Sequence, residues 1–328
     1  MKKHNIILIL VLCLAVTMFL PACSTQKEAT DITFVLDWTP NTNHTGIYVA
    51  QALGYFKEAG INVTIAQPPE DGAEMLVASG RAQFGVSFQD NMATIVSGEN
   101  KLPITAVATV IQHNTSGIMS RKGEGATSPK GMEGMKYATW QWPIEQAIIK
   151  NVVEKDGGDY SKVTMIPSTV TDEISALKSG TVDCLWIYYA WAGVATEVNN
   201  YEIDYFAFKD INPVFDYYTP VIIGNNDYLE KHPDTAKKFM EAVSKGYKYA
   251  CENPKEAADI ICKAVPELDY DHVYASQLWL KDKYIDDAPK WGYIDAARWN
   301  GFFTWLEDEK LVTDEIPDNA GFTNDFLP

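Results

Sequence analysis

Aromatic and polar side chains crowd into one short stretch, DWTPNTNH (37–44), which follows an apolar run at 32–36. An indole presents a flat face for stacking and one N–H donor, while amides and imidazole both donate and accept hydrogen bonds. This combination suits recognition of a flat, polar molecule. The alternative is structural: Trp38 packs between domains, Asn41 and His44 form a turn, and Asn43 caps the next helix. For Asn43 we favour the cap. The candidate ligand contacts are Asp37, Trp38, Asn41 and His44.

A second polar group occurs in SFQDN (87–91), which ends a strand-like run and starts a helical one. Either Asp90 or Asn91 suits the N-cap of that helix, whereas Gln89 has no capping role there. We therefore expect part of this set to face a cleft. The candidate contacts are Gln89, Asp90 and Asn91.

Two aromatic stretches in the second half of the chain complete the set. TWQWP (139–143) indicates a strand-to-helix turn, whose tryptophans either contact a ligand or only pack. In LWIYYAWAG (185–193), an extended backbone would point Trp186 and Tyr188 to one face and Tyr189 to the other. One of these faces is expected to line the cleft. The candidate contacts here are Trp140, Gln141, Trp142, Glu145, Tyr188 and Tyr189.

Short strand-like runs alternate with helical patterns from residue 31 onward. This order predicts an α/β fold with largely parallel sheets, in which ligands bind at the carboxyl ends of the strands. Turn-rich segments at 121–135 and 209–218 interrupt the alternation, and the chain beyond 226 is almost wholly helical. We predict two lobes around a cleft. Lobe 1 would comprise 31–119 and 219–328, and lobe 2 would comprise 120–218.

The amino terminus has the composition of a bacterial lipoprotein signal. Two lysines precede about 16 mostly apolar residues, and LPAC follows at 20–23. An uncleaved membrane anchor is the alternative, but a spanning helix needs about 20 apolar residues. We predict a signal peptide over 1–22, lipidation of Cys23, a tether over 23–30, and an extracytoplasmic protein anchored to the cell membrane.

Charge and cysteine content exclude several classes of function. The chain of 328 residues has a formal net charge of −17, which argues against nucleic acid or an anionic lipid surface as partner. Its five cysteines form no CxxC motif or Cys/His cluster, so no metal site is expected. Cys251 and Cys262 could pair only if the fold brings them together. Plain buried thiols are favoured.

Four stretches resemble extracellular solute-binding proteins of ABC importers. They are 37–63, SGRAQFGVSFQDN (79–91), SPKGMEGMKYAT (128–139) and ALKSGTVDCLW (176–186). The likeness is greatest to the branch that includes thiamine pyrimidine-precursor synthases and pyrimidine-precursor binding proteins. It implies a type II periplasmic-binding fold with two lobes and a helical C-terminal portion. It also implies that Trp38 lies against an aromatic ring in the cleft, and that an ABC permease receives the ligand.

The sequence departs from that family in three places. The synthase branch has a lysine at the position of Ser87 and a histidine at that of Asn91, which handle its pyridoxal phosphate and histidine substrates, and it has a cysteine-rich run that is missing here. Relatives often have a small, Gly-rich turn where this chain has Trp140 and Trp142. Several relatives also carry a carboxylate near the aromatic run, where this chain has Ala190 and Ala192. Asp37, Asp90 or Glu145 could take its role, or the ligand is a different heteroaromatic.

The resemblance and the residues together predict a monomeric solute-binding lipoprotein rather than an enzyme. The expected ligand is a small heteroaromatic, foremost a thiamine pyrimidine precursor, held between aromatic rings as the lobes close, without cofactor or covalent chemistry. The rival functions are a pyrimidine-precursor synthase that uses pyridoxal phosphate, and a binder of another solute such as an alkylsulfonate or a riboflavin-like compound. The candidate contacts contain no lysine or arginine, which disfavours an anion.

Overall fold

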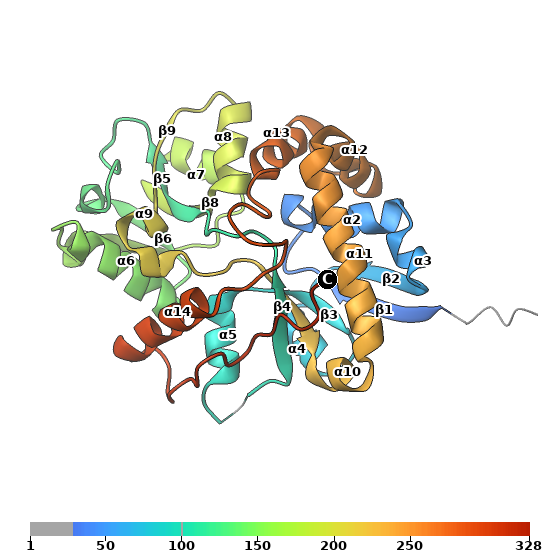
Figure 1. The fold of residues 1–328 in the computed structure, drawn as a ribbon. Helices are drawn as coiled ribbons and strands as arrows, with labels where there is room; N and C mark the ends of the chain where they lie inside the picture. Colours follow the sequence, from blue (N-terminus) through green and yellow to red (C-terminus); the bar gives the residue numbers. More distant parts are fainter. Residues whose placement is uncertain (1–28, 100) are drawn as a thin grey trace, which may run out of the picture.

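The computed structural model describes residues 29–99 and 101–328 (Figure 1). The predicted signal peptide and Cys23 lie outside the described residues. None of the helices in the described part combines the length and apolar character of a membrane span.

One five-stranded sheet has the order β2-β1-β3-β10-β4. Strand β1 runs parallel to its neighbours β2 and β3, while β10 enters antiparallel between β3 and β4. We call this sheet with its helices lobe 1. The strands are β1 (Thr30–Val35), β2 (Ile61–Ala66), β3 (Phe84–Ser87), β4 (Ile104–Thr109) and β10 (Val221–Asn225).

A second five-stranded sheet has the order β7-β6-β8-β5-β9 and forms the base of lobe 2. Here β6 runs parallel to β7 and β8, and β5 lies antiparallel between β8 and β9. Because β5 belongs to this sheet, the chain enters lobe 2 before residue 116, slightly earlier than the sequence predicts. The strands are β5 (Ser116–Arg121), β6 (Lys136–Thr139), β7 (Thr164–Pro167), β8 (Cys184–Tyr188) and β9 (Ile203–Ala207).

Helices surround both sheets, and the chain from 226 to 308 is largely helical as predicted (Figure 1). Residues 309–328 contain no helix, which the sequence does not predict. Those of the first half of lobe 1 are η1 (Thr42–His44), α2 (Thr45–Ala52), α3 (Tyr55–Glu58), α4 (Gly72–Ala78) and α5 (Gln89–Val96). Those of lobe 2 and its exit are η2 (Pro129–Met132), α6 (Pro143–Lys155), η3 (Tyr160–Lys162), α7 (Glu173–Ser179), the π-helical turn η4 (Tyr189–Gly193), α8 (Val194–Val198), α9 (Phe208–Ile211) and η5 (Pro213–Phe215). The C-terminal helices are α10 (Asn226–Lys231), α11 (Pro233–Glu252), α12 (Pro254–Ala264), α13 (Tyr270–Leu280) and α14 (Ala296–Asp308).

Helix α2, which follows the 37–44 loop, is fixed against α11 by two glycines. A Cβ on Gly46 would lie 2.2 Å from the Tyr247 ring, and one on Gly246 would lie 2.0 Å from the Gly46 carbonyl oxygen. The two backbones therefore touch where no side chain fits. In addition, the Tyr247 hydroxyl donates a hydrogen bond to the Asn43 carbonyl at 2.5 Å. The start of α2, and with it the loop before it, is held rigidly to the lobe 1 core.

The two chain crossings between the lobes are bonded to each other through Asp216. Its carboxylate accepts the Asn114 backbone N–H at 2.9 Å and lies 2.6 Å from His113 Nδ1. This hydrogen bond to Asp216 raises the pKa of His113. Both crossings thus form one connected hinge.

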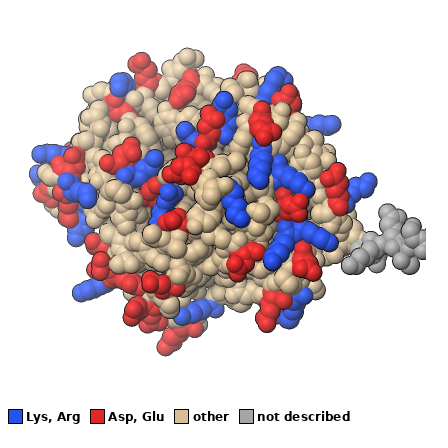
Figure 2. All heavy atoms as spheres, viewed as in Figure 1, with Lys and Arg blue, Asp and Glu red and all other residues tan. Residues whose placement is uncertain are grey.

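Surface charges are mixed, and the prediction of buried thiols holds for Cys184 but not for Cys251 and Cys262, which are half-buried. Figure 2 shows acidic and basic side chains interspersed over the visible face, rather than segregated. The three cysteines in the described residues, Cys184, Cys251 and Cys262, are free thiols. Burial raises the pKa of Cys251 to about 11, which keeps it protonated and unreactive.

Candidate functional site

The candidate residues gather because the strands before them are parallel neighbours. In lobe 1, β1 pairs with β3, so the loop at 37–44 and the segment at 88–91 leave the same edge of the sheet. In lobe 2, β6 pairs with β8, so the segments at 140–142 and 189–193 do the same. Each lobe therefore contributes two adjacent strand ends, which is where open α/β sheets bind ligands.

Within the 37–44 loop, His44 contacts protein rather than open space. It is buried, its Nε2 lies 2.6 Å from Asp37 Oδ1, and its Nδ1 accepts the Asn41 backbone N–H at 3.2 Å. Because Nδ1 accepts a hydrogen bond, the ring proton is on Nε2, which donates a hydrogen bond to Asp37. The prediction that His44 contacts a ligand is not supported, since both of its nitrogens are occupied. It orients Asp37 instead.

Asn41, not Asn43, is the cap of this loop. The Asn41 side chain accepts the Asn43 backbone N–H at 2.8 Å and donates to the Thr39 carbonyl at 3.1 Å. The prediction that Asn43 is the cap is therefore wrong. The chain forms the 3₁₀ helix η1 ahead of α2, and Asn41 caps η1. Asn41 uses its amide locally and is withdrawn as a ligand contact.

In the 37–44 loop, Asp37 and Trp38 have side-chain atoms that remain available to a ligand. The Trp38 side chain is exposed by 46% and joins no ring pair among the described residues. Asp37 lies close enough to the lobe 2 residue Tyr188 for its charge to raise the pKa of that hydroxyl, after the larger effects of burial and of Asp90. The loop thus faces lobe 2.

The polar residues after β3 separate into three roles. Gln89 is fully buried and holds the fold together: its amide donates to the Trp299 carbonyl and accepts the Tyr218 N–H, both at 2.8 Å. The predicted contact by Gln89 is thus not supported. Asn91 donates to Glu74 at 2.9 Å, and Ser87 donates to the same carboxylate oxygen at 2.7 Å.

Asp90 is the exception, because its Oδ1 is buried without any hydrogen-bond partner. Burial raises its pKa to about 6, and the charge of Glu74 adds to the effect. The N-cap position of α5 belongs to Phe88, so Asp90 does not serve as the predicted cap. A buried carboxylate oxygen without a partner is costly, and such groups concentrate at functional sites.

In lobe 2, Glu145 shapes the turn between β6 and α6. Its buried carboxylate accepts hydrogen bonds from the Tyr137 hydroxyl at 2.7 Å and the Thr139 hydroxyl at 3.1 Å. It also accepts the backbone N–H groups of Trp140 at 3.1 Å and Trp142 at 3.3 Å. Glu145 therefore has no free capacity for a ligand, and the predicted contact is not supported.

The turn that Glu145 holds presents its side chains outward. Gln141 is exposed and has a left-handed backbone with φ of 64°. Trp142 is exposed by 55%, and Trp140 is half-buried with its ring 5.8 Å from those of both Trp142 and Trp186. The three side chains are available to a ligand, although no contact places Trp142 opposite Trp38.

The aromatic run after Cys184 is a strand only as far as Tyr188. Tyr189 starts the π-helical turn, donates to Glu197 at 2.6 Å and packs against Tyr205. The predicted ligand contact by Tyr189 is thus not supported. Tyr188, on the face that includes Trp186, lies nearly parallel to Phe88 of lobe 1, at a centroid distance of 6.3 Å and an angle of 15°.

Several buried polar atoms near Tyr188 lack partners, and sequence reasoning missed most of them. The indole Nε1 of Trp186 and the hydroxyl groups of Tyr217 and Thr219 also lack a partner with good hydrogen-bond geometry. Trp186 and Thr219 nevertheless approach the Tyr188 hydroxyl closely enough to offset part of the rise in its pKa that burial causes. Asn114 does the same for the pKa of Tyr217. Tyr217 lies near both Asp90 and Tyr188, whose charges add to burial in raising its pKa. The signal in the sequence was DYYTP (216–220), which looked like an ordinary turn at a lobe boundary.

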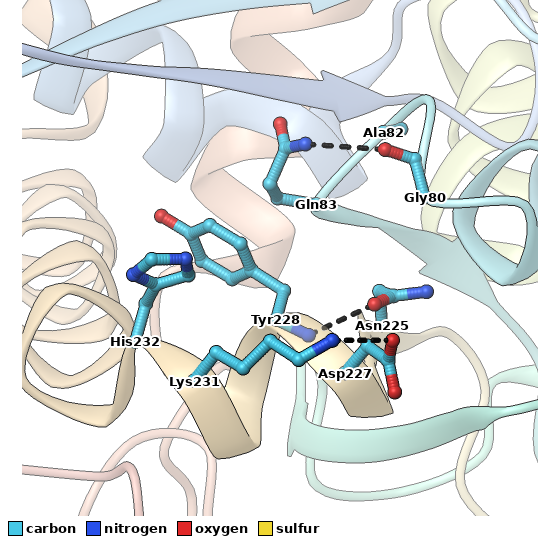
Figure 3. Close-up of a pocket in the computed structure, with 8 residues that line it drawn as sticks. All are labelled: Gly80, Ala82, Gln83, Asn225, Asp227, Tyr228, Lys231 and His232. Atoms are coloured by element: carbon cyan, nitrogen blue, oxygen red, sulfur yellow. Dashed lines mark hydrogen bonds and ion pairs between the residues drawn. The ribbon is translucent and has the colours of Figure 1, made fainter.

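Two other features lie outside this group. Figure 3 shows a hollow in lobe 1 between the start of β3 and α10, where Lys231 pairs with Asp227 at 2.8 Å. The Tyr228 hydroxyl, which also lines it, is buried without a partner. His113, Asp286 and Asp287 could approach one metal ion, but both acids are exposed and His113 is already bonded to Asp216. Neither feature includes a candidate residue at the carboxyl ends of β1, β3, β6 and β8.

Comparison with known proteins agrees with the fold and the resemblance. The family model described as NMT1/THI5 like matches residues 41–257. A formylaminopyrimidine-binding protein of Halalkalibacterium halodurans is 30% identical over 99% of each chain. The 4-amino-5-hydroxymethyl-2-methylpyrimidine phosphate synthase THI13 of Saccharomyces cerevisiae is 26% identical over 74% of each chain.

Solved structures of solute-binding proteins share the fold at low sequence identity. The aliphatic sulphonate-binding protein SsuA of Escherichia coli has a TM-score of 0.67 at 12% identity, covering 89% of this chain and 97% of its own. The nitrate-binding protein NrtA of Synechocystis has a TM-score of 0.70 at 12% identity, covering 91% of this chain and 87% of its own. The predicted two-lobed periplasmic-binding fold is confirmed.

Proposed function

Since the chain belongs to the NMT1/THI5-like family, we propose that it is a solute-binding protein of an ABC importer that captures a thiamine pyrimidine precursor. A relative similar along its whole length is a formylaminopyrimidine-binding protein. In this proposal, the lobes close by hinge motion around one small heteroaromatic molecule and then deliver it to a membrane permease.

The observation that carries the proposal is the group of unpartnered polar atoms around Asp90. Asp90 Oδ1 is an acceptor, Trp186 Nε1 is a donor, and the Tyr217 hydroxyl can be either. An aminopyrimidine carries amino donors and ring-nitrogen acceptors, which are the complementary groups to these atoms. The near-parallel rings of Phe88 and Tyr188 supply flat apolar faces beside these polar atoms.

The same group of atoms disfavours an anionic ligand. Sulfonate and nitrate, which the names of SsuA and NrtA specify, need positive charges or clustered N–H donors. Here the group contains a carboxylate, whose pKa of about 6 leaves it mostly charged at neutral pH. An anion placed beside Asp90 would be repelled.

The synthase function of other relatives is also disfavoured. The positions that the resemblance assigns to the synthase lysine and histidine are Ser87 and Asn91 here. Both donate hydrogen bonds to Glu74 Oε1, so they form a closed structural unit within lobe 1. Neither side chain can form a Schiff base with pyridoxal phosphate. We therefore propose a binder and not an enzyme.

The remaining parts of the proposal concern placement in the cell. Cleavage before Cys23 and lipidation of its thiol would anchor the protein outside the cytoplasmic membrane, close to a permease. A monomer suffices, because both halves of the candidate site come from one chain. Mass spectrometry of the protein purified from its host membrane would detect the lipid on Cys23 and reveal whether residues 1–22 are absent.

Isothermal titration calorimetry and thermal shift with purified protein test the ligand. We expect formylaminopyrimidine or hydroxymethylpyrimidine to bind and raise the melting temperature, because a ligand that binds only the folded state stabilises it. Thiamine, riboflavin and an alkylsulfonate are the comparison ligands. Stabilisation by the sulfonate alone would contradict the proposal. A Schiff-base absorbance band with pyridoxal phosphate would support the synthase instead.

A further inference from the structure

Helix α13 joins the ligand-facing loop of lobe 1 to the segment of lobe 2 that follows Tyr188. It is anchored in lobe 1, where the Gln277 amide donates to the Ala250 carbonyl at 3.2 Å. On its other side it contacts η4 and α8 of lobe 2, beside which it lies in Figure 1. Two of these inter-lobe contacts are polar. Ser276 Oγ donates to the Ala190 carbonyl at 2.5 Å, and His272 Nε2 lies 2.9 Å from the Trp191 carbonyl.

Ser276 is also bonded to the 37–44 loop, and the direction of its bonds can be derived. A carbonyl only accepts, so the single Ser276 proton goes to Ala190. The Thr42 hydroxyl, 2.6 Å from Ser276 Oγ, must therefore donate to Ser276. The Tyr284 hydroxyl in turn donates to the Thr42 carbonyl at 2.7 Å. The side chains of Thr42, Ser276 and Tyr284 are all buried.

These bonds make a directed relay from the loop of lobe 1 to lobe 2. Thr42 lies between Asp37 and α2, two residues before the His44 that orients Asp37. Ala190 lies two residues after Tyr188. The relay thus connects the segments that carry Asp37 and Tyr188, one from each lobe. Separation of the lobes would break the Ser276–Ala190 bond and leave the Ser276 hydroxyl without this acceptor.

We propose that Ser276 is a positioning residue of the ligand site, and that the Thr42–Ser276–Ala190 relay is a latch that holds the lobes closed. The latch rests on the proposed binding function and adds a prediction about kinetics. The relay is formed in the structure described, so its loss favours separation of the lobes and accelerates ligand release. One buried hydrogen bond corresponds to an increase in the dissociation rate of about fivefold.

The variants Ser276→Ala and Thr42→Val test the latch, with formylaminopyrimidine as the ligand in stopped-flow tryptophan fluorescence. We expect Ser276→Ala, which removes the bond between the lobes, to raise the dissociation rate by about fivefold. Thr42→Val removes only the bond that orients Ser276 within lobe 1, so it should raise the rate less, and the double variant should not exceed Ser276→Ala by much. The matched control is Thr196→Val. It deletes an equally buried hydroxyl bond to the Gly193 carbonyl, 2.6 Å away, that lies within lobe 2 alone. An unchanged dissociation rate in Ser276→Ala, or an equal rise in Thr196→Val, would overturn the latch.

Small-angle X-ray scattering of the ligand-free variants separates the latch from the proposed ligand. We expect Ser276→Ala to have a larger radius of gyration than the unmodified protein and Thr196→Val. If formylaminopyrimidine fails to bind the unmodified protein but Ser276→Ala still expands it, the ligand is wrong and the latch is supported. If the ligand binds and Ser276→Ala changes neither the scattering nor the release rate, the latch is wrong and the binding function stands.

Discussion

The Nε2 atom of His44 lies 2.6 Å from Oδ1 of Asp37, and both side chains are almost fully buried. The bond pairs the carboxylate that begins the 37–44 loop with the imidazole that ends it. The loop is thereby closed on itself, and the orientation of Asp37 is set before any ligand arrives.

Replacement of His44 should therefore destabilise the protein. His44→Ala leaves a buried carboxylate oxygen of Asp37 and the Asn41 N–H without partners, at a cost of about 2–4 kcal/mol in the free energy of unfolding. Urea denaturation of the ligand-free protein measures this value. His232→Ala, at an exposed histidine, is the control and should change it by less than about 0.5 kcal/mol. Equal stability of the two variants would show that the Asp37–His44 bond contributes nothing.

Removal of the Asp90 charge should strengthen the fold and weaken binding. A pKa of about 6 in place of 3.8 means that ionisation of Asp90 costs the folded protein about 3 kcal/mol at neutral pH. The folded protein keeps this proton longer than the unfolded chain does, so stability falls as pH rises from about 4 to 6 and then levels off. Asp90→Asn should remove this fall and gain stability at pH 7.5.

Chemical denaturation between pH 4 and 8, with calorimetric titration of ligand at pH 7.5, tests both effects of Asp90→Asn. Affinity should fall at least tenfold, because a charged acceptor for ligand N–H groups is lost. Asp227→Asn, at an exposed carboxylate paired with Lys231, is the control. Asp90 has no role in the site if Asp90→Asn binds ligand as tightly as the unmodified protein.

Trp38 should contribute to affinity and not to stability. Its side chain is exposed by 46% and belongs to no ring pair in the described structure, so Trp38→Ala should change the free energy of unfolding by less than about 0.5 kcal/mol. Loss of stacking should weaken ligand binding by about 1 kcal/mol or more, with Trp38→Phe intermediate. Urea denaturation measures the stability of Trp38→Ala, and calorimetric titration measures the ligand affinity of both Trp38 variants. Leu278→Ala, at a residue exposed by 40%, is the control. Unaltered affinity in Trp38→Ala would rule out stacking.

Two glycines provide a matched test of the α2–α11 contact. Gly246→Ala places a Cβ 2.0 Å from the Gly46 carbonyl oxygen, so it should cost about 3 kcal/mol or more of stability. Gly301 lies in α14 with nothing within 4 Å of a new Cβ, so Gly301→Ala should be neutral or stabilise by up to about 1 kcal/mol. Thermal unfolding of both variants distinguishes helix propensity from the steric contact. A Gly246→Ala protein as stable as Gly301→Ala would contradict the tight packing.

Periodicity and composition predicted the α/β architecture because strands and helices have local patterns that survive in the folded chain. The α2 region, the turn at 139–143 and the helical C-terminal portion all occur as expected. Local reasoning was less accurate at element ends. The capping role belongs to Asn41 and not Asn43, and Tyr189 leaves the strand for a π-helical turn. Both errors arise because hydrogen bonds at an element end, and not residue type, decide where it stops.

The sequence by itself determined the class of the protein: the order of strands and helices, the family, and the strand ends at which the candidate side chains gather. Only the tertiary structure decided which polar side chains are free. His44, Gln89 and Glu145 are satisfied by partners that only the fold supplies, such as Trp299, 210 residues from Gln89. Asp90 is the one acid among the candidates whose oxygen is both buried and unpartnered. Hydrogen-bond satisfaction depends on contacts distant along the chain, so no local pattern could show it.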